Sequence, residues 1–172
     1  MKNLIIGASS RFGERLHKVL TGVYLTRIDL DIGMSNVTYL RDRFDNIRFD
    51  NVIVLVNNRS NNIAEAARFI QSLFDTLDYV DFDKAFLFTS GKGTYIQSKD
   101  SKDLSYSVEK MLLNFVSYKR NFDVMKYILV HPGHMSTVEE YDQAVNLFID
   151  SFGNIPRKNL IWNLQKKAFM PF

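Results

Sequence analysis

The chain has 172 residues, of which 46% are hydrophobic and 24% charged, as in an ordinary globular protein with one domain and a substantial core. It contains no cysteine, which excludes disulfides, thiolate catalysis and cysteine-ligated metals and fits a cytoplasmic protein. No apolar run reaches the ~18 residues of a membrane span, and the first apolar run is too short for a signal peptide. We therefore expect no membrane partner.

The net charge of +3 and the pI near 9.0 raise the question of a nucleic-acid partner. The sequence has no block of lysine and arginine and no basic stripe with interleaved aromatic residues, so we expect none. A surface that tolerates small anionic ligands is the milder interpretation. His131 and His134 flank a Pro-Gly pair where a metal site is conceivable, but no further ligand is evident, and we predict a loop without metal.

The first predicted strand, Asn3 to Gly7, leads into a Gly/Ser-rich turn and a helix from Glu14 to Leu20. Small residues between a strand and a helix let backbone N–H groups approach a phosphate, whose charge the helix dipole favours. An ordinary strand-to-helix turn is the alternative. Because two glycines stand six apart at the N-terminus, we favour an anion-binding turn, Gly7-Ala8-Ser9-Ser10-Arg11-Phe12-Gly13.

Strands and helices alternate along the remaining chain. This pattern predicts an α/β fold with a doubly wound parallel sheet of about six strands and helices on both faces, in a single domain spanning 1–172. The predicted strands are Val23 to Leu30, Asn51 to Val56, Lys84 to Thr89, Val124 to Val130 and Asn159 to Trp162. The predicted helices are Asn36 to Phe44, with Ser35 as a cap, Ile63 to Leu77, a helix from about 104 to Arg120 after a polar loop, and Val138 to Phe152, with Ser136 or Thr137 as a cap, followed by a peripheral tail from Lys166.

A tyrosine and a lysine stand four residues apart near the start of the helix that ends at Arg120. Residues at this spacing share one helix face, so the phenol of Tyr106 and the ammonium of Lys110 can meet in one pocket. A nearby cation favours the phenolate and lowers the tyrosine pKa towards the range of a general acid and base. By itself this pair is common, and an ordinary helix face is the alternative.

These features together resemble the short-chain dehydrogenase/reductase family, in order and over nearly the whole chain. The turn from Gly7 to Gly13 resembles its glycine-rich loop, and Asn57-Asn58-Arg59 resembles the start of its Asn-Asn-Ala-Gly segment. Ser90 follows a strand as the family's catalytic serine does. Tyr106 to Lys110 matches its Tyr-x-x-x-Lys motif, and 132–137 matches its Pro-Gly-x-x-x-Thr segment.

The resemblance implies a Rossmann-like fold and an NAD(P)H-dependent carbonyl reductase or alcohol dehydrogenase. In this family's mechanism Tyr106 is the acid and base, Lys110 lowers its pKa and binds the nicotinamide ribose, and Ser90 holds the substrate oxygen. The fourth member is an asparagine, for which Asn62 or, alternatively, Asn61 is placed. The resemblance implies cofactor contacts from Gly7, Ser9, Ser10, Phe12 and Gly13 to the ribose and pyrophosphate, from Asn57 and Asp31 on the adenosine side, and from Pro132, Gly133 and Thr137 near the nicotinamide.

Two arginines predict which cofactor is preferred. Arg11 replaces the middle glycine of the loop, and Arg27 stands where this family often keeps an aspartate for the ribose 2′-hydroxyl. Because guanidinium groups match a 2′-phosphate, we predict NADP(H) over NAD(H). Asp29 or Asp31 would favour NAD(H) if the strand ended later than expected.

The chain is also shorter than its family implies. Between Val23 and Val56 there is room for one strand, helix and strand, so one crossover is lost, and no substrate lid separates Thr137 from the next helix. A dinucleotide-binding regulatory module without turnover is therefore the alternative function. In this family the two long helices, here about 62–78 and 104–120, commonly form a dimer interface, which predicts a homodimer.

Overall fold

The computed structural model describes residues 1–32, 37–57, 62–89 and 101–170. Seven strands form one sheet in the order β2-β1-β3-β4-β5-β6-β7. All neighbouring strands are parallel except β6 and β7, which are antiparallel. The strands are β1 (Asn3–Ile6), β2 (Val23–Leu25), β3 (Arg48–Val54), β4 (Asp81–Phe88), β5 (Tyr127–His131), β6 (Ile161–Asn163) and β7 (Ala168–Phe169).

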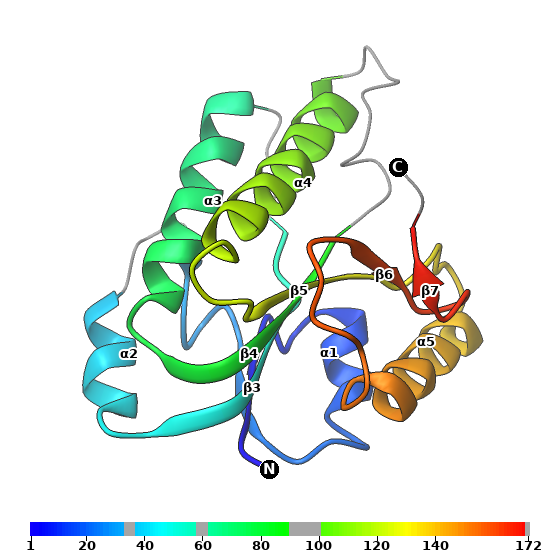
Figure 1. The fold of residues 1–172 in the computed structure, drawn as a ribbon, viewed down its shortest axis with the longest axis horizontal. Coiled ribbons are helices and arrows are strands. Elements are labelled where there is room, and N and C mark those ends of the chain that lie inside the picture. The colour runs from blue at the N-terminus through cyan, green and yellow to red at the C-terminus, as the bar shows by residue number, and fades with distance from the viewer. Residues whose placement is uncertain (33–36, 58–61, 90–100, 171–172) are drawn as a thin grey trace.

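Helices cover both faces of the sheet (Figure 1). On one face α3 packs against α4 and α2 contacts α3, and on the other α1 packs against α5. Among the described residues, no helix is long and apolar enough to cross a membrane. The helices are α1 (Arg11–Leu16), α2 (Val37–Phe44), α3 (Ile63–Leu77), α4 (Ser101–Arg120) and α5 (Val138–Ser151).

Alternating side chains along each central strand build two hydrophobic clusters, one on each face of the sheet. In β1, Leu4 and Ile6 join the cluster that contains Phe74 of α3, whereas Ile5 joins the cluster that contains Phe148 of α5. Because successive strand residues point to opposite faces, a strand buried on both sides has to be apolar throughout. This explains the continuous apolar runs in the sequence.

The structure confirms the predicted α/β architecture and the helix from Ile63 to Leu77. Between β2 and β3 it has the single helix α2, as the short sequence there predicts. Several boundaries differ: α1 spans Arg11–Leu16 where Glu14 to Leu20 was predicted, α4 begins at Ser101, inside the predicted polar loop, and most strands are shifted by a few residues. The sheet has seven strands where about six were predicted. The seventh comes from the tail, which was expected to be peripheral but pairs with β6, where the Met170 amide donates to the Ile161 carbonyl at 2.8 Å.

The second strand is shorter than predicted because a local turn ends it. The strand stops at Leu25, and the Asp29 carboxylate accepts hydrogen bonds from the Thr26 amide at 2.8 Å and the Thr26 hydroxyl at 2.9 Å. The Leu30 amide donates to the Thr26 carbonyl at 3.0 Å. An aspartate that bonds nearby backbone offers the chain an alternative to the sheet ladder. Arg27 therefore stands on a turn at the strand's end.

Candidate functional site

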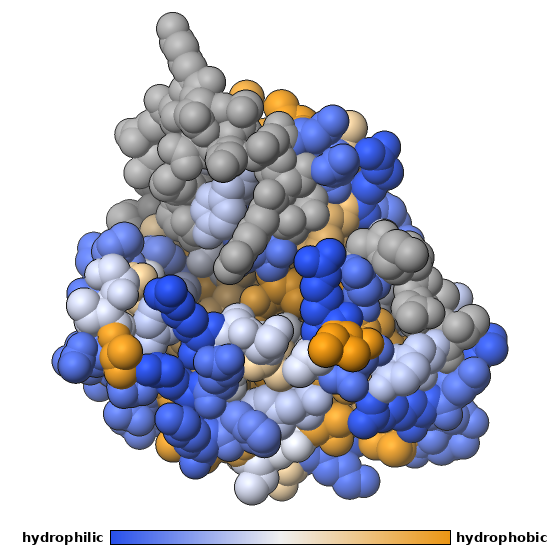
Figure 2. Space-filling model, turned by 180° about the vertical axis from the view of Figure 1, so that it is seen from behind, coloured by the Kyte–Doolittle hydropathy of each residue, from blue (hydrophilic) through white to orange (hydrophobic). Residues whose placement is uncertain are grey.

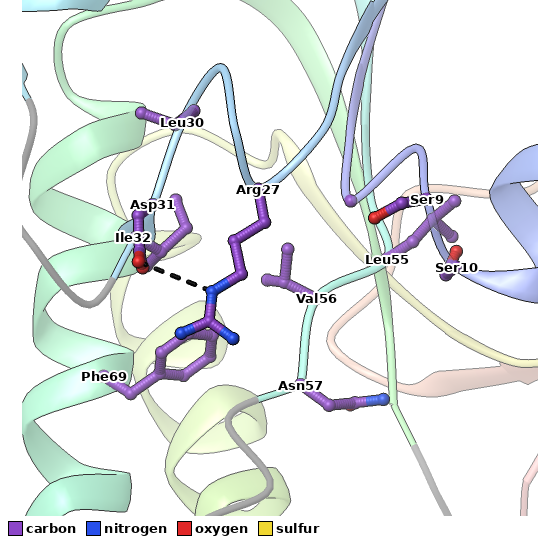
Figure 3. Close-up of a pocket in the computed structure, with 11 residues that line it drawn as sticks. Ser9, Ser10, Arg27, Leu30, Asp31, Ile32, Leu55, Val56, Asn57 and Phe69 are labelled. Atoms are coloured by element: carbon purple, nitrogen blue, oxygen red, sulfur yellow. Dashed lines mark hydrogen bonds and ion pairs between the residues drawn. The ribbon is translucent and has the colours of Figure 1, made fainter.

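A crevice runs along the carboxyl ends of the parallel strands, where ligands bind in open α/β sheets. It consists of two cavities, of about 410 and 700 Å³, that share Ser10, Leu55 and Asn57. The first, here the turn cavity, is lined by Gly7, Ser9, Ser10, Arg27, Leu30, Asp31, Ile32, Leu55, Val56, Asn57 and Phe69 (Figure 3). The second, here the tyrosine cavity, is lined by Ser10, Arg11, Phe12, Leu55, Asn57, Phe88, Thr89, Tyr106, Lys110, His131, Pro132, Gly133, His134, Met135 and Tyr141.

The turn from Gly7 to Gly13 is tight enough to require both glycines. Gly7 has φ +88°, and a Cβ there would lie 3.0 Å from the Leu55 carbonyl carbon. A Cβ on Gly13 would lie 2.7 Å from the Ala8 carbonyl oxygen. The Ser10 hydroxyl accepts from the Gly13 amide at 3.0 Å and so caps α1. Both glycines thus keep the strand-to-helix turn compact, and Gly7, Ser9 and Ser10 of this turn line the turn cavity.

The residues after Ser10 contribute to the tyrosine cavity. Arg11 begins α1 and is exposed, whereas Phe12 is buried, with its ring centroid 4.7 Å from that of Phe88. Phe12 also packs near the ring of Phe148, so its side chain belongs to the hydrophobic core as well as to the lining of the tyrosine cavity. Arg11 lines this cavity, and Arg27 lines the other.

The Arg27 side chain projects across the turn cavity towards Asp31 (Figure 3). The Arg27 Nε and the Asp31 Oδ2 are 3.4 Å apart, and 84% of the Arg27 side chain is exposed. This pair is long and solvated, so it constrains the guanidinium weakly. Asp29, the other acidic candidate, is committed to Thr26, whose hydrogen bonds lower the pKa of that carboxyl. Of the two, it is Asp31 that lines the cavity.

Lys110 is buried in α4, with 2% of its surface exposed. Its Nζ donates to the Asn57 Oδ1 at 2.7 Å and to the Phe88 carbonyl at 3.5 Å, and lies 5.5 Å from the centroid of the Tyr106 ring. Burial lowers the pKa of Lys110, and the charge of Glu109 acts in the opposite direction. The structure therefore brings the predicted tyrosine and lysine together in one cavity.

The contact between Lys110 and Asn57 was not predicted from the sequence. Asn57 was expected on the adenosine side, but it follows β3 and lines both cavities at their junction. Thr89 was also missed: its hydroxyl donates to the buried Asn114 Oδ1 at 2.8 Å while it lines the tyrosine cavity. The available signal was their position at the carboxyl end of a predicted parallel strand: Thr89 ends one, and Asn57 follows another.

β5 ends at His131, and this residue lines the tyrosine cavity together with Pro132 and Gly133. Burial lowers the pKa of His131, which keeps its ring neutral near pH 7. Gly133 has φ +91°, and a Cβ there would meet the Gln165 amide at 2.3 Å, so only glycine fits. Pro132 and Gly133, which the resemblance assigns to the nicotinamide, thus line the cavity that contains Tyr106.

Thr137 and Asn62 act as helix caps and line neither cavity. The Thr137 hydroxyl accepts from the Glu140 amide at 3.2 Å at the start of α5, and the Glu140 carboxylate accepts from the amides of Thr137 and Ser136. These bonds lower the pKa of Glu140 to about 2. The Asn62 Oδ1 accepts from the Ala64 amide at 2.8 Å and begins α3.

Several predicted residues lie outside the described part of the chain, namely Ser35, Asn58, Arg59, Asn61 and Ser90. Across the described ranges, no group of three or more histidine or acidic side chains is arranged to hold a metal ion. The described site is thus a crevice between β1, β3, β4 and β5 with a tight glycine turn on one side and a tyrosine–lysine pair on the other.

The strand order and this crevice define a Rossmann-like α/β protein. The sequence matches no protein-family model and no curated protein. Solved structures of similar fold include a small-chain dehydrogenase, with TM-score 0.73, 13% identity and coverage of 98% of both chains. A carbonyl reductase from Pseudomonas aeruginosa PAO1 has TM-score 0.71, 14% identity and coverage of 100% of both chains.

A putative short-chain alcohol dehydrogenase from Burkholderia multivorans has TM-score 0.70 and 15% identity, with 99% of both chains covered. The same Pseudomonas carbonyl reductase has also been solved in complex with NADP, with TM-score 0.68 to this chain at 14% identity. The protein therefore has the fold of these short-chain dehydrogenases and reductases over 98–100% of its length.

Proposed function

We propose that this protein is an NAD(P)H-dependent oxidoreductase of the short-chain dehydrogenase/reductase family that interconverts a carbonyl compound and an alcohol. The observation that carries the proposal is the meeting of Tyr106 and Lys110 in a cavity that continues, through Asn57, into the cavity under the glycine turn. A dinucleotide needs such a paired crevice, and the acid and base needed for carbonyl reduction stand at its far end. The fold of the neighbouring structures supports the same class.

The residues present fit a dinucleotide. Gly7 lines the turn cavity, and Gly7 and Gly13 keep the turn beside it tight, since a Cβ on either would meet neighbouring backbone. Such a turn between a strand and a helix is where dinucleotide-binding folds hold the pyrophosphate. Gly7, Ser9 and Ser10 would hold the adenine-side ribose and pyrophosphate, Asp31 would lie at the adenosine, and Pro132 and Gly133 would lie at the nicotinamide. When bound, the nicotinamide supplies or accepts the hydride.

Tyr106 is the group proposed to move the proton. In the reductive direction its hydroxyl gives a proton to the carbonyl oxygen, and the phenolate that remains is stabilised by the Lys110 ammonium 5.5 Å from the ring centroid. Asn57 holds that ammonium by its 2.7 Å hydrogen bond. Ser90 is proposed to hold the substrate oxygen, and Asn62 stays a candidate for the fourth position beside its role as a cap.

The direct test is to titrate the protein with NADPH and NADH by calorimetry and then to screen ketones and aldehydes for NADPH oxidation. Micromolar binding of a reduced cofactor together with turnover of one or more carbonyls would support the proposal. Binding without any turnover would favour the regulatory module. No binding of either cofactor would contradict both, since each depends on a dinucleotide in the crevice.

The proposed preference for NADP(H) depends on Arg27. Replacing Arg27 with glutamine removes the guanidinium at the turn cavity and is expected to weaken NADPH binding about tenfold, because a charge-assisted hydrogen bond to the 2′-phosphate is lost. NADH binding should be unchanged. Calorimetric Kd values for both cofactors check this. Arg41→Gln, on α2 and outside both cavities, is the matched control; an equal loss for NADH would contradict the assignment.

We also propose that the protein is a homodimer through the outer surface of α3 and α4. Phe115 of α4 is 65% exposed, and Met111 of α4 and Ile63 of α3 are also exposed on this packed pair of helices. Large apolar side chains on packed helices favour a second covering layer. Replacing Phe115 with glutamate is therefore expected to convert dimer to monomer, measured by light scattering. The control, Val19→Glu, adds the same charge at an exposed valine after α1 and should leave the dimer intact; a wild-type monomer would refute the interface.

A further inference from the structure

The arginine and lysine side chains that line the crevice differ in how their charge is balanced. Among the described lining residues these cations are Arg11, Arg27 and Lys110. Arg27 faces Asp31 at 3.4 Å. Lys110 donates to Asn57 and lies next to Glu109, whose charge raises its pKa against the effect of burial. Two of the three cations thus have a counter-charge within the protein.

Arg11 has none within the described part of the chain. It makes no ion pair or hydrogen bond there, it is exposed, and it lines the tyrosine cavity. No aspartate or glutamate is among the described residues that line this cavity. His131 and His134 also line this cavity, and neither adds negative charge. Burial keeps His131 neutral, and His134 interacts with Glu140. The tyrosine cavity therefore has a net positive wall.

Figure 2 shows a hydrophilic surface on the face opposite that of Figure 1, with hydrophobic residues gathered in a hollow near its middle. The lining of the tyrosine cavity likewise has an apolar and a charged part. Phe12, Phe88 and Met135 are apolar, and the exposed Arg11 supplies a positive charge. Such a site suits a small organic body that carries one anionic group.

We propose that the substrate is a carbonyl compound bearing a carboxylate or a phosphate, and that Arg11 binds this anionic group. The inference depends on the function proposed above and adds the substrate class. A guanidinium presents two parallel N–H donors to a carboxylate or phosphate, so it fixes orientation as well as charge. Because Arg11 lines the cavity of Tyr106 and not that of Ser9, its charge is placed for the reacting molecule rather than for the adenine-side ribose.

The experiment compares one acid with its neutral ester. The wild type and Arg11→Gln are saturated with NADP⁺, which prevents reduction, and para-fluorophenylglyoxylate and its methyl ester are titrated by fluorine NMR. The wild type is expected to bind the acid about tenfold more tightly than the ester, as the loss of a charge-assisted hydrogen bond predicts. Arg11→Gln should remove this preference and leave ester binding and the NADP⁺ affinity unchanged. Arg41→Gln is the charge-matched control.

Each other outcome overturns the inference. Equal binding of acid and ester by the wild type, or no binding of the acid, excludes an anion site in this cavity. A loss of NADP⁺ affinity in Arg11→Gln without a change in the acid-to-ester ratio assigns Arg11 to the pyrophosphate instead. Failure of NADP⁺ to bind the wild type is seen separately by calorimetry and contradicts the proposed function; the acid-to-ester ratio on the cofactor-free protein then still decides the role of Arg11.

Discussion

Replacing Tyr106 with phenylalanine is expected to lower kcat by about 10²–10⁴-fold, the usual contribution of a positioned general acid or base. The variant keeps the aromatic ring that lies over the Lys110 ammonium and removes the hydroxyl that would give its proton to the carbonyl oxygen. NADPH binding should therefore be retained. Steady-state kinetics with the best carbonyl found in the screen, together with calorimetry for NADPH, measure both quantities on one preparation.

Tyr118→Phe is the matched control for this variant. Tyr118 is on the same helix, its hydroxyl is partly buried, and it lines neither cavity. Its removal should leave kcat unchanged. If Tyr106→Phe kept wild-type turnover, the proton would have to come from another group in the crevice, and the proposed mechanism would be wrong even if the cofactor were bound.

How much of this site could be predicted follows from the sequence distance between the partners. Tyr106 and Lys110 are four apart on one helix, so local geometry alone brings them together. The glycine turn is equally local, because Gly7 and Gly13 flank a single strand-to-helix junction. The meeting of Tyr106 and Lys110 in one cavity and the strand-to-helix turn between Gly7 and Gly13 were therefore both predicted from the sequence. Asn57 and Lys110 are 53 residues apart, and their contact depends on the register of β3, β4 and the α4 packing, which no local pattern specifies.

The two arginines illustrate the same limit. Arg11 and Arg27 were both interpreted as partners of a 2′-phosphate, Arg11 because it replaces the middle glycine of the loop and Arg27 because it stands where the family often keeps an aspartate. In the fold, Arg11 starts the helix after β1 and lines one cavity, whereas the Asp29 turn ends β2 early and leaves Arg27 in the other. The hydrogen bonds of one aspartate side chain thus decide which cavity Arg27 lines. At the sheet's far edge the strand predicted at Asn159 to Trp162 is confirmed as β6 (Ile161–Asn163), whereas β7 was not predicted, since a two-residue strand has almost no pattern.

Replacing Lys110 with methionine is expected to abolish turnover and at the same time to stabilise the fold. Burial lowers the pKa of Lys110 below its ordinary value of 10.5, so the charged form is held at a cost in the native state. Exchanging a buried charge for an apolar side chain of similar volume is expected to raise the free energy of unfolding by about 1–3 kcal/mol near neutral pH. Urea unfolding followed by fluorescence measures the change.

The pH dependence of this gain has a defined sign. Between the lowered native pKa and 10.5, the unfolded chain binds more protons than the native protein, so wild-type stability rises with pH. The methionine variant lacks this slope, and its advantage should shrink as pH approaches 10.5. Lys119→Met, at an exposed lysine of the same helix, should show neither the gain nor the slope.

Asn57→Ala removes the hydrogen-bond acceptor and leaves the ammonium buried, so it should lower the free energy of unfolding. If Lys110→Met instead lowered stability at every pH, the hydrogen bond to Asn57 would outweigh the desolvation of the ammonium. Lys110 would then be a structural residue of α4 and not a charge that the fold keeps, at a cost, for the chemistry of Tyr106.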